Sequence, residues 1–190
     1  MSLALLDWRR SVAALHAAVR DEPDPREAHR LWCETRQRLF STHPESPSHT
    51  ASLRVAPYDE AWRFRAALEP AEPLRIELAT ATDGVVPFRR IGCVTLGPVG
   101  TLDVWWLDSY GGGVWLPLRD ANPESYGGGR YVLDTVKGAD LGGDGDTLVV
   151  DLNFAYNPSC AYDEAWACPL APEGNRTDVV VPVGELLPSR

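Results

Sequence analysis

The segment LVVDLNFAY at 148–156 places two polar side chains in an otherwise apolar stretch. Alternate residues of a β-strand point to the same face, so Asp151 and Asn153 share one face and the opposite face is strongly apolar. If the polar face lines a pocket, Asp151 could act as a general base or as a hydrogen-bond acceptor. The alternative is the solvent-facing side of an antiparallel strand.

Three consecutive glycines at 127–129 lead directly into Arg130. Backbone N–H groups of such a turn can converge on an anion, and Arg130 could clamp the anion with two hydrogen bonds. The motif is neither a Walker A loop nor GxGxxG before a helix, so no nucleotide site is predicted. The alternative is a glycine bulge that turns the chain, with Arg130 paired to an internal carboxylate such as Asp120 or Asp151.

Cys160 follows the turn that Asn157 and Pro158 predict. A nucleophilic cysteine needs a nearby base or cation, and all four histidines precede residue 50. We therefore expect a buried, inert thiol, and a hydrolase that uses Cys160 or a carboxylate pair is a less favoured alternative. Cys160 and Cys168 are the closest pair of cysteines, but their spacing fits no common zinc pattern, so we expect neither a metal nor a cofactor.

The first forty residues predict two helices. Leu5, Trp8, Val12, Leu15 and Val19 recur at steps of three and four, which gives one apolar stripe. Asp24 is a suitable N-cap for a second helix that starts at Pro25 and ends near His43 and Pro44. The inner face of this second helix is expected to consist of Ala28, Leu31, Trp32, Thr35 and Leu39.

From residue 50 the apolar pattern changes to a period of two. The predicted strands lie near 62–68, 73–80, 85–96, 101–108, 113–118, 130–135, 147–156 and 179–184. Short glycine-rich connections imply antiparallel neighbours, and we read Gly111–Gly113 as a hairpin between two tryptophan-containing strands. The expected fold is mainly β: an antiparallel sandwich or partly closed barrel (50–190) after a helical segment (1–49), as one compact domain.

Composition narrows the function further. The chain has 190 residues, a formal net charge of −9 and a pI near 4.9. An acidic surface without a basic stripe disfavours nucleic acids and anionic membranes as partners. Charged residues interrupt the apolar N-terminus and no apolar run would span a bilayer, so we expect a cytoplasmic protein.

Several segments together resemble a known family. HPESP (43–47), APYDEAWRF (56–64), RDANPESYGGGRY (119–131), DLNFAYNPSCAY (151–162) and CPLAPEGN (168–175) resemble, in this order, a prokaryotic domain-of-unknown-function family, number sixteen eighty-four. The resemblance runs from about residue 36 to Glu185 and implies no reaction. It implies that the signature positions cluster: Arg119, Asp120, Tyr126, Gly127, Gly128, Gly129, Arg130, Tyr131, Asp151, Asn153, Tyr156, Asn157, Cys160, Tyr162, Cys168 and Asn175.

The leading hypothesis is a β domain that binds a small polar or anionic ligand, whether or not it is also catalytic. The expected ligand-binding residues are Arg119, Tyr126, Gly128, Arg130, Asp151, Asn153, Tyr156, Asn157 and Tyr162. We expect the glycine turn and the end of strand 147–156 to border a shared hollow. The alternative is a structural or protein-interaction module whose signature residues form a buried polar network, with Arg130 and Asp151 as an ion pair.

Overall fold

The computed structural model describes residues 3–80, 84–166 and 168–188. Within them two helices precede the strands, and short 3₁₀ turns connect the later elements. The helices are α1 (Leu3–Asp21) and α2 (Pro25–Thr42). The strands are β1 (Arg63–Ala67), β2 (Arg75–Thr80), β3 (Gly84–Thr95), β4 (Thr101–Leu107), β5 (Val114–Leu118), β6 (Arg130–Asp134), β7 (Gly143–Asp144) and β8 (Thr147–Asp151).

Both predicted helices are confirmed, together with the break between them. The Asp24 side chain accepts a hydrogen bond from the backbone N–H of Arg26 at 2.9 Å, and Pro25 opens α2 because its missing N–H would have no partner there. Helix α2 ends at Thr42, since the residue before Pro44 is pushed out of the helical region. The predicted apolar stripe of α1 is buried only in its second half, and Leu5 is exposed.

The strands form two antiparallel sheets, as in a sandwich, and not the partly closed barrel that was the other expectation. The five-stranded sheet has the order β2-β3-β4-β5-β6, and the three-stranded sheet has the order β1-β8-β7. The predicted hairpin between tryptophan-containing strands is confirmed, because Trp105 of β4 pairs with Trp115 of β5. One apolar core joins residues from both sheets with residues from both helices, such as Leu15 and Trp32.

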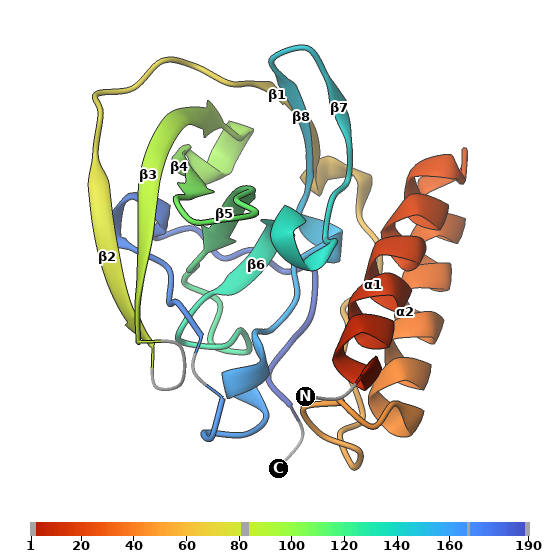
Figure 1. The fold of residues 1–190 in the computed structure, drawn as a ribbon. Coiled ribbons are helices and arrows are strands. Elements are labelled where there is room, and N and C mark those ends of the chain that lie inside the picture. Colours follow the sequence, from red (N-terminus) through yellow and green to blue (C-terminus); the bar gives the residue numbers. More distant parts are fainter. Residues whose placement is uncertain (1–2, 81–83, 167, 189–190) are drawn as a thin grey trace.

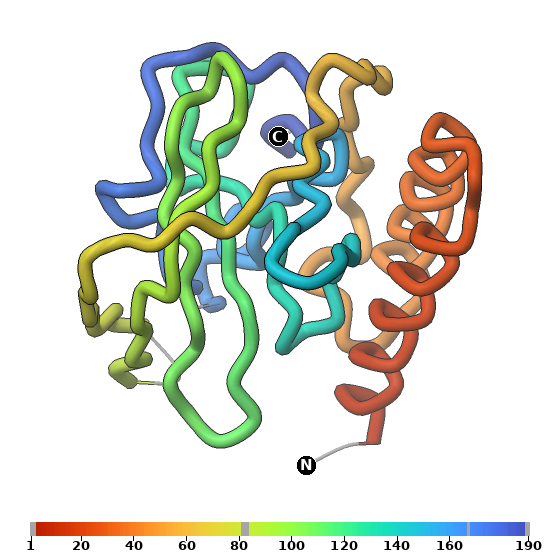
Figure 2. The backbone as a smooth tube through the Cα atoms, turned by 90° about the horizontal axis from the view of Figure 1, so that it is seen from above, coloured from red at the N-terminus to blue at the C-terminus, as the bar shows by residue number. Residues whose placement is uncertain are grey.

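The helix pair lies on one side of the β domain, beside β7 and β8 and far from β2 and β3 (Figures 1 and 2). Helix α1 packs closely on the 3₁₀ turn Thr135–Lys137 that follows β6. Gly138 ends this turn with φ of +89°, and a Cβ there would lie 2.9 Å from the backbone nitrogen of Ala13. Glycine is therefore required at this position both for the backbone conformation and for the close approach of the helix.

The long strand predicted at 147–156 is wrong in its second half. Strand β8 ends at Asp151, and residues Leu152–Phe154 form a 3₁₀ turn capped by the Asp151 carboxylate, which accepts the N–H of Asn153 at 3.0 Å. The capped turn breaks the alternation, so both Asp151 and Asn153 are buried, at 1% and 0% exposure. Neither side chain lies on the solvent-facing strand surface that was one expectation.

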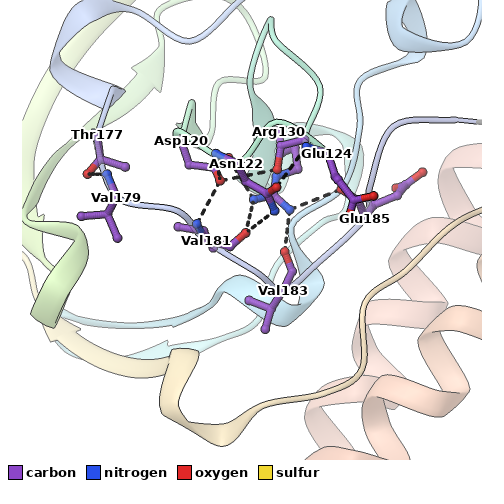
Figure 3. A network of polar contacts seen from close by, with 10 residues as sticks. Asp120, Asn122, Glu124, Arg130, Thr177, Val179, Val181, Val183 and Glu185 are labelled. Atoms are coloured by element: carbon purple, nitrogen blue, oxygen red, sulfur yellow. Dashed lines mark hydrogen bonds and ion pairs between the residues drawn. The ribbon is translucent and has the colours of Figure 1, made fainter.

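The strand predicted at 179–184 does not form. Instead, this segment crosses the β domain as an extended chain held by side chains and by scattered backbone bonds (Figure 3). The Asp120 carboxylate accepts the N–H of Val181 at 3.1 Å, and the Asn122 amide donates to the Val181 carbonyl at 3.0 Å. The β-branched composition that predicted a strand therefore reflects burial, since Val181 and Val183 are at most 2% exposed.

Arg130 is the centre of this contact network (Figure 3). Its guanidinium pairs with Asp120 at 3.0 Å, and both side chains are at most 1% exposed. It also donates to the carbonyls of Val181, Val183 and Glu185. The predicted pairing of Arg130 with an internal carboxylate is thus confirmed for Asp120 and not for Asp151.

Removing the Asp120 carboxylate should destabilise the protein strongly, because it leaves the buried Arg130 charge unpaired. We expect Asp120→Ala to lower the free energy of unfolding by about 3–5 kcal/mol. The matched control is Asp144→Ala, whose exposed pair with Arg65 should contribute about 0–1 kcal/mol. Urea unfolding measures both, and equal losses for the two variants would contradict this role for the Asp120–Arg130 pair.

Candidate functional site

The predicted site residues other than Arg130 and Tyr162 fall into three groups. Asp151 and Asn153 belong to a polar cluster near the start of β1. Asn153 donates to Asp151 at 2.7 Å and to the Asp59 carbonyl at 2.9 Å, while its own side-chain oxygen accepts the Asp59 N–H at 2.8 Å. Both polar side-chain atoms of Asn153 are thus hydrogen-bonded within the protein, which gives this residue a structural role.

The second carboxylate oxygen of Asp151, Oδ2, makes two weaker contacts. The Tyr58 hydroxyl lies 3.4 Å away and the Arg63 Nε lies 3.6 Å away. Burial raises the pKa of the Asp151 carboxyl. Asp151 also lines a polar hollow of about 300 Å³ between the end of α1 and the three-stranded sheet. The arginines in its lining are already paired with carboxylates: Arg20 with Asp140, Arg63 with Asp151 and Arg65 with Asp144.

A second group surrounds the glycine turn. Arg119 is exposed. Its backbone N–H donates to the Asn175 carbonyl, and its carbonyl accepts the N–H of Thr177. Gly128 accepts the N–H of Ala171 at 3.2 Å, so its carbonyl serves the fold. The Tyr126 hydroxyl lies 3.6 Å from the Cys160 sulfur. Asp151 lines a hollow whose lining does not include Arg130, and the Arg130 side chain is fully buried. The two residues therefore do not border that hollow together.

Tyr162 lies near the end of α2. Its ring packs edge-on against Phe40 with 4.9 Å between the centroids. Its hydroxyl is buried, and within the described part of the chain it has no hydrogen-bond partner.

Tyr156 and Asn157 form the third group, and they line a hollow between the helix pair and the β domain. We call it the interdomain hollow; it encloses about 80 Å³. Aromatic rings make up much of its wall: Trp8, Trp32, Phe40, Tyr131 and Tyr156. Its polar lining residues are His16, Arg36, Lys137, Asn157, Ser159 and Cys168.

Arg36 of α2 is the most constrained cation of the interdomain hollow. Two of its nitrogens bind the buried Glu185 carboxylate at 3.0 and 3.1 Å. Its guanidinium carbon lies 4.7 Å from the Phe40 ring centroid and 4.8 Å from that of Tyr156, which is within the range of a cation–π interaction. The remaining Nη1 has no hydrogen-bond partner in the part of the chain that the structure describes.

Asn157 supplies an unused acceptor. The side chain is 2% exposed, its Nδ2 donates to the Leu186 carbonyl at 2.8 Å, and its backbone N–H donates to Glu185. Its Oδ1 is buried, and no described group donates to it. An unpaired buried amide oxygen costs about 1–3 kcal/mol, so a donor from a bound molecule would stabilise it.

His16 adds a neutral acceptor to the same wall. Its Nδ1 lies 3.0 Å from the Val12 carbonyl, which can only accept, so Nδ1 carries the proton. Burial lowers the pKa of His16 to about 4, so the ring is uncharged at neutral pH and its Nε2 is an acceptor.

Cys160 differs from the buried, inert thiol that we expected. It is half-buried, and the thiol of Cys168 together with the hydroxyl of Tyr126 lowers its pKa to about 6. The backbone N–H of Cys160 donates to the Cys168 sulfur at 3.4 Å. Its described side-chain partners are a tyrosine and a cysteine, so the Cys–His arrangement of a hydrolase is not present among them.

The residues that sequence reasoning missed come from the helices. Trp8 and Trp32 were expected on inner faces, but as core residues only. Arg36 lies one turn after Trp32, so a cation on the apolar face of α2 was the available signal. His16 gave no such signal, because a lone histidine beside an apolar stripe is most often a core residue.

The described residues contain no group of three or more His, Cys, Asp or Glu side chains placed to hold a metal ion. Neither described helix combines the length and the apolar character needed to cross a membrane.

Comparisons with known proteins agree with the family resemblance. Residues 49–186 match the model of a family described as "Protein of unknown function (DUF1684)". The chain is also similar to an uncharacterized protein of Haloarcula marismortui solved by solution NMR. The two are 29% identical with a TM-score of 0.55, and the match covers 80% of this chain and 89% of that one. The comparison with curated proteins found no match.

The buried neutral His16 should make the protein less stable in acid. Because its pKa is lower when folded than its ordinary value of 6.5, the unfolded chain binds the proton more readily as the pH falls from about 6.5 to 4. Between pH 7 and pH 4 we expect the wild type to lose about 3 kcal/mol more than His16→Gln.

The matched control for this pH effect is His49→Gln, since His49 is exposed. Its unfolding free energy should follow that of the wild type at every pH. Urea unfolding across the pH range tests this, and a parallel decline in wild type and His16→Gln would rule out the assigned protonation state.

Proposed function

Since the chain belongs to the DUF1684 family of unknown function, which brings no reaction with it, we propose a function from geometry: the interdomain hollow binds a small anionic molecule with a flat apolar body. The observation that carries the proposal is an aromatic hollow whose lining includes Asn157, a buried residue whose Oδ1 accepts from no described group. Native proteins rarely leave such atoms unpaired, so a bound donor is the simplest explanation.

The charges of the wall favour an anion. Arg36 keeps one nitrogen free after pairing with Glu185, and Lys137 lies on the same wall with its side chain about half exposed. The loose pair of Lys137 with Asp134, at 3.5 Å, leaves ammonium protons for a ligand. A carboxylate between these two cations would form charge-assisted hydrogen bonds.

The aromatic rings of the hollow favour a ligand with a flat apolar body. Trp8, Phe40 and Tyr156 offer flat apolar surface, and a planar ligand can stack on such rings. A donor group on the ligand would satisfy Asn157. The volume of about 80 Å³ restricts the occupant to a small molecule, so a single-ring carboxylate is a suitable class of probe.

The polar hollow that includes Asp151 is a weaker candidate. Its arginines already face carboxylates, so an incoming anion would have to compete with Asp140, Asp144 and Asp151. In the interdomain hollow the lining residue Asn157 has an acceptor without a described donor, whereas no described lining residue of the polar hollow has a buried side-chain atom without a partner. This difference decides between the two places.

A second candidate function is a structural or protein-interaction module. The observation that favours it is the internal hydrogen bonding of several signature residues. The two terminal nitrogens of Arg130 bind Asp120 and three carbonyls, and both polar side-chain atoms of Asn153 are bonded within the protein. Asn175 likewise accepts from Trp105 and donates to two carbonyls. In this case the exposed loops would be the contact surface.

Calorimetric titration with benzoate and with its neutral analogue benzamide tests the ligand proposal. We expect benzoate to bind and benzamide to bind about tenfold more weakly. A charge-assisted hydrogen bond from the carboxylate to the cations contributes about 1.5–3 kcal/mol, against about 0.5–1.5 kcal/mol for the neutral bond that the benzamide N–H₂ donates to Asn157. Lys137→Gln should weaken benzoate binding by a similar factor. Arg36 is unsuitable for this test, because its removal leaves the buried Glu185 carboxylate without its paired cation.

The matched control is Arg65→Gln, which removes a cation from the polar hollow and should leave benzoate binding unchanged. If Arg65→Gln lost benzoate binding and Lys137→Gln kept it, the ligand would bind in the polar hollow and the proposal would be wrong. Absence of binding by benzoate and by other single-ring carboxylates at millimolar concentration would favour the module.

A further inference from the structure

Two cysteines that the proposed ligand site does not require lie side by side. Cys160 belongs to the 3₁₀ turn Ser159–Ala161 after β8, and Cys168 lies eight residues beyond it. The backbone N–H of Cys160 donates to the Cys168 sulfur at 3.4 Å, which places the Cys168 sulfur against the turn that carries Cys160. Both are reduced and half-buried, so small reagents can reach them.

We propose that Cys160 and Cys168 form a thiol–disulfide exchange site, at which a small-molecule disulfide oxidises the pair to an intramolecular disulfide. Cys160 is the attacking thiol and Cys168 the resolving one. This assignment rests on the cysteine geometry and does not depend on a ligand in the interdomain hollow.

The surroundings assign the two roles. The Cys168 thiol and then the Tyr126 hydroxyl, 3.6 Å from the Cys160 sulfur, lower the pKa of Cys160 to about 6. At neutral pH Cys160 is therefore largely a thiolate, which is the reactive form. The same contact raises the pKa of Cys168, so that residue keeps its proton until the first step is complete.

The other two cysteines lack this environment. Burial raises the pKa of Cys33 to about 11, and it also raises the pKa of Cys93. Both stay protonated at neutral pH, and neither has a cysteine among its described hydrogen-bond partners. They serve as internal controls for thiol reactivity.

The exchange balances in two steps. The Cys160 thiolate attacks one sulfur of a disulfide R–S–S–R, forms a mixed disulfide and expels a thiolate, which takes up a proton to give one RSH. Cys168 then loses its proton and attacks the Cys160 sulfur, which forms the internal disulfide and expels the second RS⁻ as RSH. The pair is oxidised by two electrons, and the small disulfide is reduced to two thiols.

The signature residues around the glycine turn support this site. Tyr126 orients the Cys160 sulfur, and the Gly128 carbonyl holds the segment after Cys168 through the Ala171 N–H. The Tyr131 hydroxyl donates to the Pro169 carbonyl, next to Cys168. These contacts give Tyr126, Gly128 and Tyr131 a shared role in positioning the two sulfurs.

Oxidised glutathione at neutral pH, followed by intact-mass and peptide analysis, tests the proposal. The wild type should lose two hydrogen atoms in mass, yield a peptide pair joined through Cys160 and Cys168, and return to the starting mass with dithiothreitol. Cys168→Ser should stop at a glutathione adduct on Cys160. Cys160→Ser should react at least tenfold more slowly.

The double variant Cys33→Ser/Cys93→Ser is the matched control and should oxidise like the wild type. Tyr126→Phe should shift the midpoint of Cys160 alkylation by iodoacetamide from about pH 6 to higher pH, because the thiolate loses a donor. A stable mixed disulfide in the wild type would show that Cys168 cannot resolve it. Unchanged kinetics in Cys160→Ser would show that Cys160 is not the attacking thiol. Either result overturns the proposal.

Discussion

The buried guanidinium of Arg130 is the constraint on which the site depends. It pairs with Asp120 and donates to the carbonyls of Val181, Val183 and Glu185, which are every second residue of the last segment (Figure 3). That segment forms no β-strand. That segment delivers Glu185, whose carboxylate binds Arg36 of α2 and the N–H of Asn157. The Arg130 contacts therefore position Glu185, which joins α2 to Asn157 at the interdomain hollow.

The interdomain hollow is lined by two parts of the chain, of which only one lies inside the region that matches the family model. Tyr131, Tyr156, Asn157 and Cys168 lie inside the region that matches the family model, at 49–186, whereas the helices precede it. Arg36 joins the two parts, because it contacts Glu185 and the Tyr156 ring at once. The helix pair is therefore part of the proposed site and not only a cover for the sheets.

Local rules predicted the helices well, because the Asp24 cap and Pro25 act within a few residues of the break. They failed after Asp151, where a side-chain cap ended the strand, and at 179–184, where long-range bonds from Arg130 replaced a sheet. The candidate site was predicted only in part. Tyr156 and Asn157 line the hollow, but their partners on α1 and α2 are more than a hundred residues away in sequence, beyond any local pattern.

The most direct test of the proposed binding site follows the indole N–H signals of the protein by NMR during a benzoate titration, with Trp8 assigned by Trp8→Phe. Trp8 and Trp32 line the interdomain hollow, whereas Trp105 bonds Asn175 elsewhere in the core. We predict saturable shifts for Trp8 and Trp32 and none for Trp105. Shifts confined to the side-chain signals of Arg63 and Arg65, or no shifts at all, would contradict the assignment of this hollow as the binding site.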